Sequence, residues 1–170
     1  MLKAYRGIYP LIAPGVFIED TAVIIGDVRI ESESSVWFHS VVRGDVNSIR
    51  IGRRTNIQDL CLLHVTHHTH PLYIGDEVTI GHHVVLHGCT IHHRVLIGMG
   101  AIIMDGADIG EDCVIGAGSL VTERTVIPPK SLVVGSPARV KRQVTDRELR
   151  WIKESAQHYI EYARQYTGTE

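Results

Sequence analysis

The segment IGHHVVLHGC, residues 80–89, places His82, His83 and His87 inside an otherwise apolar run. An imidazole is costly to bury without a partner, and a neutral imidazole is the commonest metal ligand in proteins. His82 and His87 are five residues apart, a spacing that lines them up on neither a helix face nor a strand face. Any chemistry they share therefore depends on the elements that position them.

An aliphatic residue recurs every six residues through most of the chain. Twenty positions at this spacing, from Ile12 to Val133, all hold Ile, Val or Leu. The spacing is interrupted three times: by a three-residue insertion after Val42, a five-residue insertion after Leu63 and a one-residue deletion after Leu86. A period of six fits neither an α-helix nor a continuous flat strand. It fits a short strand followed by a corner, with the aliphatic side chain pointing inward.

This pattern resembles the hexapeptide repeat of the left-handed parallel β-helix, in which three hexapeptides make one triangular turn. The resemblance implies the handedness, and twenty repeats imply just under seven turns. We therefore expect an all-β coil as a domain over residues 1–144. Small residues four positions after many of the aliphatic ones fit the bends of such a coil.

Residues 145–166 predict a single α-helix. Thr145 and Glu148 have the spacing of a capping box. The apolar residues that fall on one face at helical spacing are Leu149, Ile152, Ala156, Ile160 and Ala163. We expect this helix to pack along the side of the coil and cover apolar surface.

The register of the repeat brings two histidines together. Leu63 and Leu86 are equivalent positions on adjacent turns, so His64 and His87, which follow them, should stack at the strand spacing of about 4.8 Å. Two imidazoles at that separation can tilt onto one zinc ion, with Zn–N distances of about 2.0–2.1 Å. Arg43 belongs to the same column, one turn below.

His82 belongs to the preceding side of the coil, where it stacks above Asp59. Extended-chain reach puts its backbone about 12–15 Å from His87, around a corner. His82 should therefore not reach a metal held by His64 and His87 of its own chain. Packing around a threefold axis would bring it to the neighbouring subunit's pair and leave a fourth position open, as in a catalytic zinc site. The alternative is three ordinary polar histidines on a sheet surface.

Three segments carry a resemblance to a known family. VVRGDVNSIRIG (41–52), TNIQDLCLLHV (55–65) and IGHHVVLHGC (80–89) resemble the γ-class carbonic anhydrases and their close relatives. The resemblance implies a homotrimer with a metal held by three histidines at each subunit interface. It implies metal ligands His64, His82 and His87, interface ion pairs of Arg43, Asp45 and Asp59, and Gln58 and Asn56 as residues that contact or orient metal-bound solvent.

The activity implied is that of a lyase, the hydration of CO2 to bicarbonate by a metal-bound hydroxide. Zinc lowers the pKa of its bound water from 15.7 to about 7, and imidazole ligands suit Zn2+, Fe2+ and Co2+ alike. The best-characterised type of this family carries an acidic loop whose glutamate shuttles protons, whereas VTHHTHPLY (65–73) holds no carboxylate. Its histidines, His67, His68 and His70, are candidate shuttles, because imidazole is the side chain suited to proton transfer near neutral pH, and Tyr159 is a further candidate. The missing acidic loop leaves the turnover rate open.

Other functions remain open at this point. The end of the coil, VVGSPARVKR (133–142), resembles that of the hexapeptide acyltransferases, which bind acyl-CoA between subunits. A zinc hydroxide could also hydrolyse an acyl-CoA thioester, and a relative that keeps the metal without catalysis is a third alternative. Metal stoichiometry separates the transferase from the other two.

Composition limits the partners and the compartment. The 170 residues have a net charge of −2, which gives no electrostatic reason to expect nucleic acid or an anionic membrane as a partner. The sequence shows no signal peptide and no apolar run of about 20 residues. Cys61, Cys89 and Cys113 are odd in number and far apart, which predicts buried reduced thiols in the cytoplasm.

Overall fold

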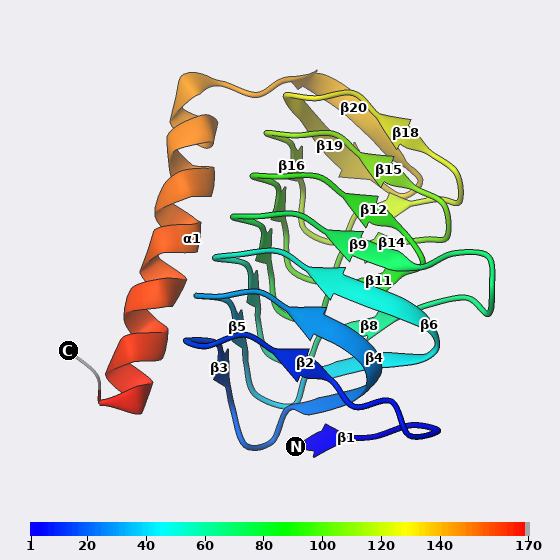
Figure 1. The fold of residues 1–170 in the computed structure, drawn as a ribbon. Coiled ribbons are helices and arrows are strands. Elements are labelled where there is room, and N and C mark those ends of the chain that lie inside the picture. Colours follow the sequence, from blue (N-terminus) through cyan, green and yellow to red (C-terminus); the bar gives the residue numbers. More distant parts are fainter. Residues whose placement is uncertain (169–170) are drawn as a thin grey trace.

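The computed structural model describes residues 1–168, which form a triangular coil of parallel β-strands with one α-helix along its side (Figure 1). The architecture is the predicted left-handed β-helix of about seven turns. The three faces arise because each hexapeptide contributes one short strand and one corner. Each strand pairs with its equivalents on the turns below and above.

The first face is the one that the helix covers. It consists of the parallel strands β3 (Phe17–Ile18), β5 (Ser35–Val36), β7 (Asn56–Ile57), β10 (Thr79–Ile80), β13 (Leu96–Ile97), β16 (Val114–Ile115) and β19 (Ser131–Gly135). The strand β20 (Ala138–Gln143) pairs antiparallel with β19. It folds back over the last turns, where it lies at the end of the coil opposite the N-terminus (Figure 1).

Two long strands turn the corner between the other two faces. They are β4 (Val23–Ile30) and β6 (Val41–Ile51), which pair with each other. Each begins on the second face and ends on the third. The second face continues with β8 (Leu62–His64), β11 (Val85–His87), β14 (Ile102–Ile103) and β17 (Leu120–Val121), and β1 (Leu2–Lys3) pairs with the start of β4. The third face holds β2 (Leu11–Ile12), β9 (Leu72–Ile74), β12 (Thr90–Ile91), β15 (Asp108–Ile109) and β18 (Val126–Ile127).

The aliphatic positions of the six-residue period form the core, as predicted. Eighteen of the twenty are buried. The other two, Ile12 and Ile18, are half-buried because they belong to the first turn, which has a neighbouring turn on one side only. Burial of an Ile, Val or Leu side chain contributes about 1.5–3 kcal/mol, so this axial column stabilises the coil along its whole length.

The insertions in the repeat leave the coil at its corners. The three-residue insertion produces a register irregularity between β4 and β6, with Gly26 opposite Gly44 and Val28 opposite Ile49. The five-residue insertion forms a loop after β8 that is closed by an antiparallel bridge between Thr66 and His70. Both insertions therefore project polar residues beside the second face without disturbing the core.

The helix α1 spans Asp146–Thr167, with Thr145 as its N-cap. The predicted capping box is present: the Thr145 amide donates to Glu148 Oε2 at 2.7 Å, and the Glu148 amide donates to Thr145 Oγ1 at 3.3 Å. Ile152, Ala156 and Ile160 are buried against the coil. Within residues 1–168, α1 is the one helix, and it does not combine the length and apolarity that a bilayer span needs.

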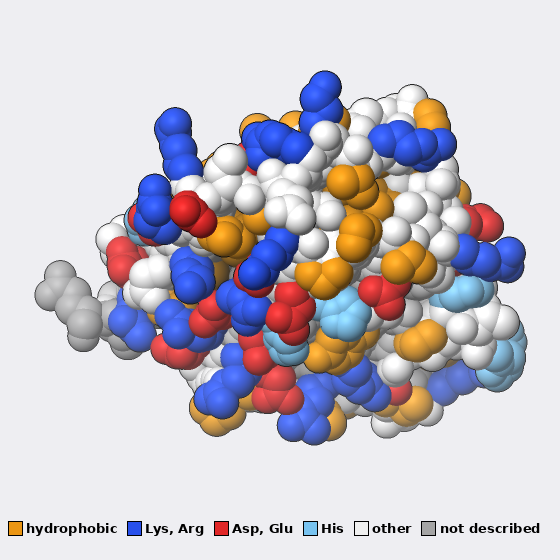
Figure 2. Space-filling model, turned by 90° about the horizontal axis from the view of Figure 1, so that it is seen from above, with side chains coloured by type: hydrophobic (Ala, Val, Ile, Leu, Met, Phe, Trp, Pro, Cys, Tyr) orange, Lys and Arg blue, Asp and Glu red, His pale blue; other side chains and the backbone are white. Residues whose placement is uncertain are grey.

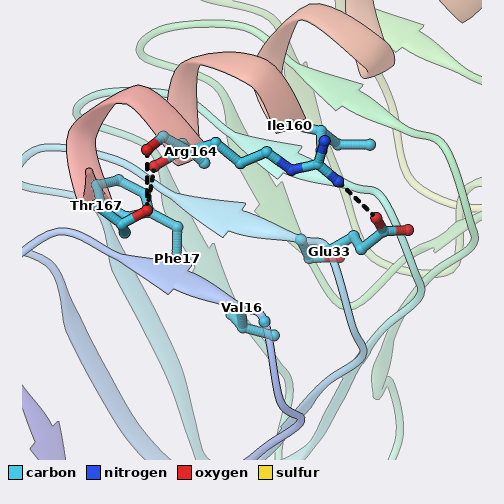
Figure 3. A pocket seen from close by; sticks show the side chains of 9 residues that line it. Val16, Phe17, Glu33, Ile160, Arg164 and Thr167 are labelled. Carbon is cyan, nitrogen blue, oxygen red and sulfur yellow. Dashed lines mark hydrogen bonds and ion pairs between the residues drawn. The ribbon is translucent and has the colours of Figure 1, made fainter. Parts of the chain in front are cut away.

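The last turns of α1 border a hollow on the surface of the coil. A cavity of about 390 Å³ lies between this part of the helix and β3, lined by Val16, Phe17 and Ile160 among others (Figure 3). Arg164 reaches across it to Glu33, with Nη2 and Oε1 3.3 Å apart. This ion pair ties the end of the helix to the first turns of the coil.

Candidate metal centre

His64 and His87 stack on the second face. They end β8 and β11, and they are direct partners in the strand register. Their facing nitrogens, Nδ1 of His64 and Nε2 of His87, lie 3.1 Å apart. Two nitrogens bound tetrahedrally to one zinc ion would be about 3.3 Å apart. The predicted column is confirmed, and its geometry suits two ligands of one metal.

Each of these rings is held from behind by a carboxylate. Nε2 of His64 lies 3.0 Å from Asp45 Oδ1, and Nδ1 of His87 lies 2.6 Å from Asp105 Oδ1. A carboxylate on the outer nitrogen fixes the tautomer and orientation of a metal-binding histidine. Both rings therefore present an unprotonated nitrogen to the same point when the outer nitrogen carries the proton.

The two carboxylates are themselves anchored. Asp45 accepts a hydrogen bond from Arg43 Nη1 at 2.5 Å, and Asp105 accepts one from Thr66 Oγ1 at 2.6 Å. Partial burial acts to raise the pKa of Asp45, but the bonds from Arg43 and His64 outweigh it and the pKa is lowered. The pKa of Asp105 is lowered in the same way, against burial, by Thr66 and His87. Both groups are thus ionised at neutral pH.

Burial also affects His64 directly. The pKa of His64 is lowered, chiefly because burial disfavours the charged ring, although Asp45 acts to raise it. A neutral imidazole is the form that binds a metal ion. The site therefore keeps His64 in its ligating form at neutral pH.

His82 lies around the corner, in the turn that follows β10. Its Nδ1 atom is 2.7 Å from Asp59 Oδ2, and its side chain is 39% exposed. Asp59 is the residue that the register places one turn below it. His82 thus has the same arrangement as the other two histidines, with a carboxylate on one nitrogen and the other nitrogen turned away from that carboxylate.

One chain does not assemble a complete centre by itself. Among residues 1–168, no three His, Cys, Asp or Glu side chains lie close enough together to hold one metal ion. The chain instead offers a preorganised pair on the second face and a third histidine at a corner. This two-plus-one division is what a site shared between subunits requires.

The expected ion pairs of Arg43, Asp45 and Asp59 across a subunit interface stay a prediction. Within the chain, Arg43 pairs with Asp45 and Asp59 pairs with His82. Sequence reasoning missed Asp105 altogether. Ile103 is the partner of Leu86 on the next turn, so Asp105, two residues after Ile103, lies level with Gly88, the residue after His87. Extending the repeat register by one turn from His87 would have identified Asp105.

Gln58 and Asn56 lie on the strand that leads to Asp59, under the helix. Gln58 Nε2 donates to Asn56 Oδ1 at 3.2 Å, and Asn56 Nδ2 donates to Thr79 Oγ1 at 2.9 Å. Both side chains are buried. They therefore belong to the His82 side of the centre, not to the side of His64 and His87, and Asn56 fixes the orientation of the Gln58 amide.

The loop histidines divide into two groups. His67 and His68 are exposed, with ring centroids 3.6 Å apart, and line an open cavity of about 450 Å³ that also borders Asp45. His70 is half-buried, and its Nδ1 lies 3.0 Å from Thr69 Oγ1. His67 and His68 are thus the loop histidines that border the surroundings of His64.

Tyr159 lies on the His82 side. It packs edge-on against Trp37, with ring centroids 5.4 Å apart, and lines a cavity of about 250 Å³ together with Asp59. Burial, with the nearby Asp59 charge, raises the pKa of Tyr159 to about 12. A phenol with that pKa keeps its proton at neutral pH and is a poor proton shuttle.

Comparison with known proteins agrees with the fold. Residues 88–123 match the family model described as bacterial transferase hexapeptide (six repeats). A solved structure of a putative acetyltransferase from Bacillus cereus superimposes with a TM-score of 0.96 at 45% identity, covering 100% of this chain and 98% of that one.

Curated relatives carry a more specific name. The chain is 51% identical over 150 residues to a probable carbonic anhydrase of Methanocaldococcus jannaschii, covering 88% of this chain and 94% of the relative. It is 43% identical over 160 residues to the mitochondrial gamma carbonic anhydrase 2 of Arabidopsis thaliana, covering 91% of this chain. The match spans 58% of the plant protein, which is therefore longer than the part this chain resembles.

Proposed function

Because the chain belongs to the γ-class carbonic anhydrases and their hexapeptide-repeat relatives, we propose that it hydrates CO2 to bicarbonate at a metal centre shared between the subunits of a homotrimer. The observation that carries this proposal is the pair of facing nitrogens of His64 and His87, 3.1 Å apart, with His82 held around the corner. All three histidines are backed by an aspartate, which supports a ligand role over that of ordinary surface residues.

An aliphatic stripe supports the trimer. Leu62, Val85, Ile102 and Leu120 are in register on the second face, on the strands that carry His64 and His87. Leu62 and Ile102 are 42% and 41% exposed in the single chain. The first face is already covered by α1, whereas the second face is free and carries His64 and His87 beside this stripe, so we assign it to packing against the His82 corner of a neighbouring copy.

Zinc, when bound, supplies a hydroxide nucleophile at neutral pH, because it lowers the pKa of water from 15.7 to about 7. The residues of the chain do the rest. His64 and His87 of one subunit and His82 of the next would hold the ion, and their aspartates would keep each ring in its ligating orientation. We assign Gln58, which lies on the His82 side, to positioning CO2 through its amide. The same ligand set suits Fe2+ and Co2+.

Proton removal is assigned to the loop after β8. Net hydration releases one proton, which a group with a pKa near neutrality must carry to solvent. His67 and His68 are exposed, lie with their rings in contact, and share a cavity with Asp45. We assign to them the role that the acidic loop has in the best-characterised type of the family, whereas the raised pKa of Tyr159 argues against Tyr159 as the shuttle.

The reducing compartment expected from the cysteines has one supporting observation. Cys61, Cys89 and Cys113 are all buried, unpaired thiols. Disulfides are rare in the cytoplasm, where such thiols persist. We therefore assign the chain to a reducing compartment such as the cytoplasm.

Stopped-flow measurement of CO2 hydration on zinc-loaded protein tests the proposal. The matched blank is His87→Ala, which removes one ligand from the exposed face. Activity in the native chain that is absent in the blank is the expected result. A native chain with one metal per subunit and no rate above the blank would overturn the proposal.

One observation favours a second candidate. The Bacillus cereus structure at 45% identity is titled a putative acetyltransferase, so acyl-CoA chemistry at the same coil is the runner-up. A transferase would bind acyl-CoA without metal, whereas thioester hydrolysis would need the metal centre. Assays of acyl-CoA consumption with and without the metal separate these two, and metal binding without either activity would leave a non-catalytic relative.

A further inference from the structure

The basic residues of the chain are concentrated at one end. Residues 130–153 hold seven of the seventeen Lys and Arg but only two of the nineteen Asp and Glu. We call these seven residues the basic end: Lys130, Arg139, Lys141, Arg142, Arg147, Arg150 and Lys153. All seven are exposed. The net charge of −2 for the whole chain therefore hides a local positive excess, balanced by acidic residues elsewhere.

These residues share one place in the fold. They belong to β20, to the residue directly before β19 and to the first turns of α1, which all lie at the end of the coil opposite the N-terminus (Figure 1). Figure 2 looks down on this end and shows Lys and Arg side chains dispersed over it. The positive N-terminus of α1 adds to the same field.

Most of this charge is not neutralised within the chain. Arg142 is the exception, because its two terminal nitrogens bind Glu148 at 2.8 and 2.9 Å. In residues 1–168, the structure records no ion pair for the other six. Among the acidic groups on these elements, Glu148 is taken by Arg142, which leaves Asp146 and Glu154 facing the remaining cations.

Apolar side chains stand among the cations. Val134, Val140 and Trp151 are 38%, 47% and 52% exposed. An open hollow of about 640 Å³ is lined by Trp151, by the three arginines Arg142, Arg147 and Arg150, and also by Glu148 and Glu154. Tryptophan beside Lys and Arg is the combination found at the membrane–water interface, where the ring sits at headgroup level and the cations meet lipid phosphates.

We propose that the basic end docks on the surface of an anionic lipid bilayer. The cations contact the phosphate headgroups, and Trp151 with the two valines enters the boundary with the acyl chains. Single-stranded nucleic acid is a poorer fit, because such proteins stack successive bases on several aromatic side chains, and Trp151 is the one aromatic residue of 130–153.

This inference goes beyond the proposed function and needs no metal. In a homotrimer with parallel coils, the three basic ends would face the same side and bind one surface together, which increases the apparent affinity. A polybasic surface attracted to anionic lipid loses binding as salt rises. Docking should therefore be strong at low ionic strength and reversed by added salt.

The test uses the full chain with vesicles of phosphatidylglycerol and phosphatidylcholine, and with vesicles of phosphatidylcholine alone. Binding is measured by co-sedimentation and by tryptophan emission. The chain has two tryptophans, and Trp37 is only 5% exposed, so a blue shift on binding reports Trp151. Trp151→Phe should abolish that shift while leaving most of the sedimentation.

The variant Lys141→Gln, Arg147→Gln, Arg150→Gln removes three cations of the basic end. Its matched control is Lys3→Gln, Arg29→Gln, Arg53→Gln, which removes three exposed cations elsewhere and gives the same net charge. The first variant should bind the anionic vesicles about tenfold or more weakly, and the control should bind like the native chain. Equal loss in both, no binding of the native chain at low salt, or binding to an oligonucleotide in preference to vesicles would each overturn the proposal.

Discussion

The Nδ1 atom of His64 lies 3.1 Å from the Nε2 atom of His87, although 23 residues separate the two in the chain. The two rings belong to adjacent turns, so the strand spacing of the coil brings both within reach of one ion. The third ligand is the one that must be brought from elsewhere.

Replacing His82 tests whether it completes the centre. His82→Ala should abolish stoichiometric metal binding, because two histidines remain at each site, and should leave the coil folded, because the side chain is part-exposed and outside the core. Metal content by atomic absorption and secondary structure by circular dichroism measure the two effects. A variant that retains one metal per chain would contradict the shared site.

Mixed trimers give the matching control. Chains with His82→Ala keep the His64 and His87 pair, and chains with His87→Ala keep His82. If ligands come from two subunits, each mixed trimer contains one complete site, whereas either variant alone contains none. Failure of every mixed sample to bind metal would mean that the ligands are not divided in this way.

Asp105 should control how tightly His87 holds the ion. Asp105→Asn removes the carboxylate that orients the ring, and loss of such a partner typically weakens metal affinity about 10–100-fold. Competition with a chelator of known affinity measures the change. Asp108→Asn is the control, since Asp108 pairs with His92 on the third face, with Oδ1 3.0 Å from His92 Nε2, and should leave the affinity unchanged.

We expect that the Asp105 carboxylate can keep its position only if residue 88 is a glycine. The φ of Gly88 is +51°, and a Cβ there would meet Asp105 Oδ1 and lie 2.6 Å from His70 Cβ. Gly100 also has a positive φ, +69°, but its Cβ would have open space. Gly88→Ala should therefore reduce the free energy of unfolding by about 1–3 kcal/mol more than Gly100→Ala does, as expected for overpacking. Urea denaturation of both variants measures the difference, and equal losses would show that crowding is not the cause.

The start of α1 should show a specific pH dependence. Bonds from Arg142 and Thr145 lower the pKa of Glu148 from its ordinary 4.5 to about 2. A carboxyl whose pKa is lowered by folding stabilises the native state fully above its unfolded pKa, and that contribution is lost as the pH falls through the folded pKa. Glu148→Gln should therefore lower the melting temperature at pH 7, and the gap to the native chain should narrow from pH 4.5 down to about 2. Thermal denaturation over that range measures it, and a gap independent of pH would contradict the ion pair.

The sequence predicts the features that depend on a period. The recurrence of Ile, Val and Leu predicts the coil, its register predicts that His64 stacks on His87, and the spacing of Thr145 and Glu148 predicts the start of the helix. The aspartates behind the histidines are harder to predict. Asp45 lies in a three-residue insertion, where the period no longer says which way a side chain points. The in-chain partners of Arg43 and Asp59 depend on rotamers at corners, which a six-residue pattern leaves undefined.

The basic end shows a different limit of sequence reasoning. Net charge is a sum over the chain, and a value of −2 predicts no anionic partner. The sum says nothing about where the charges lie. Only the folding of β20 over the coil, next to the first turns of α1, brings the cations of residues 130–153 to one surface.

The antiparallel direction of β20 affects whether the protein can assemble into fibres. Each end of a parallel coil presents unpaired backbone groups, and such an edge can template the addition of further chains into a fibre. The antiparallel β20 gives the upper end an edge strand that runs against the others and carries Arg139, Lys141 and Arg142. Like charges would meet if two such ends approached. The strand therefore opposes end-to-end stacking of coils and keeps the protein in discrete particles.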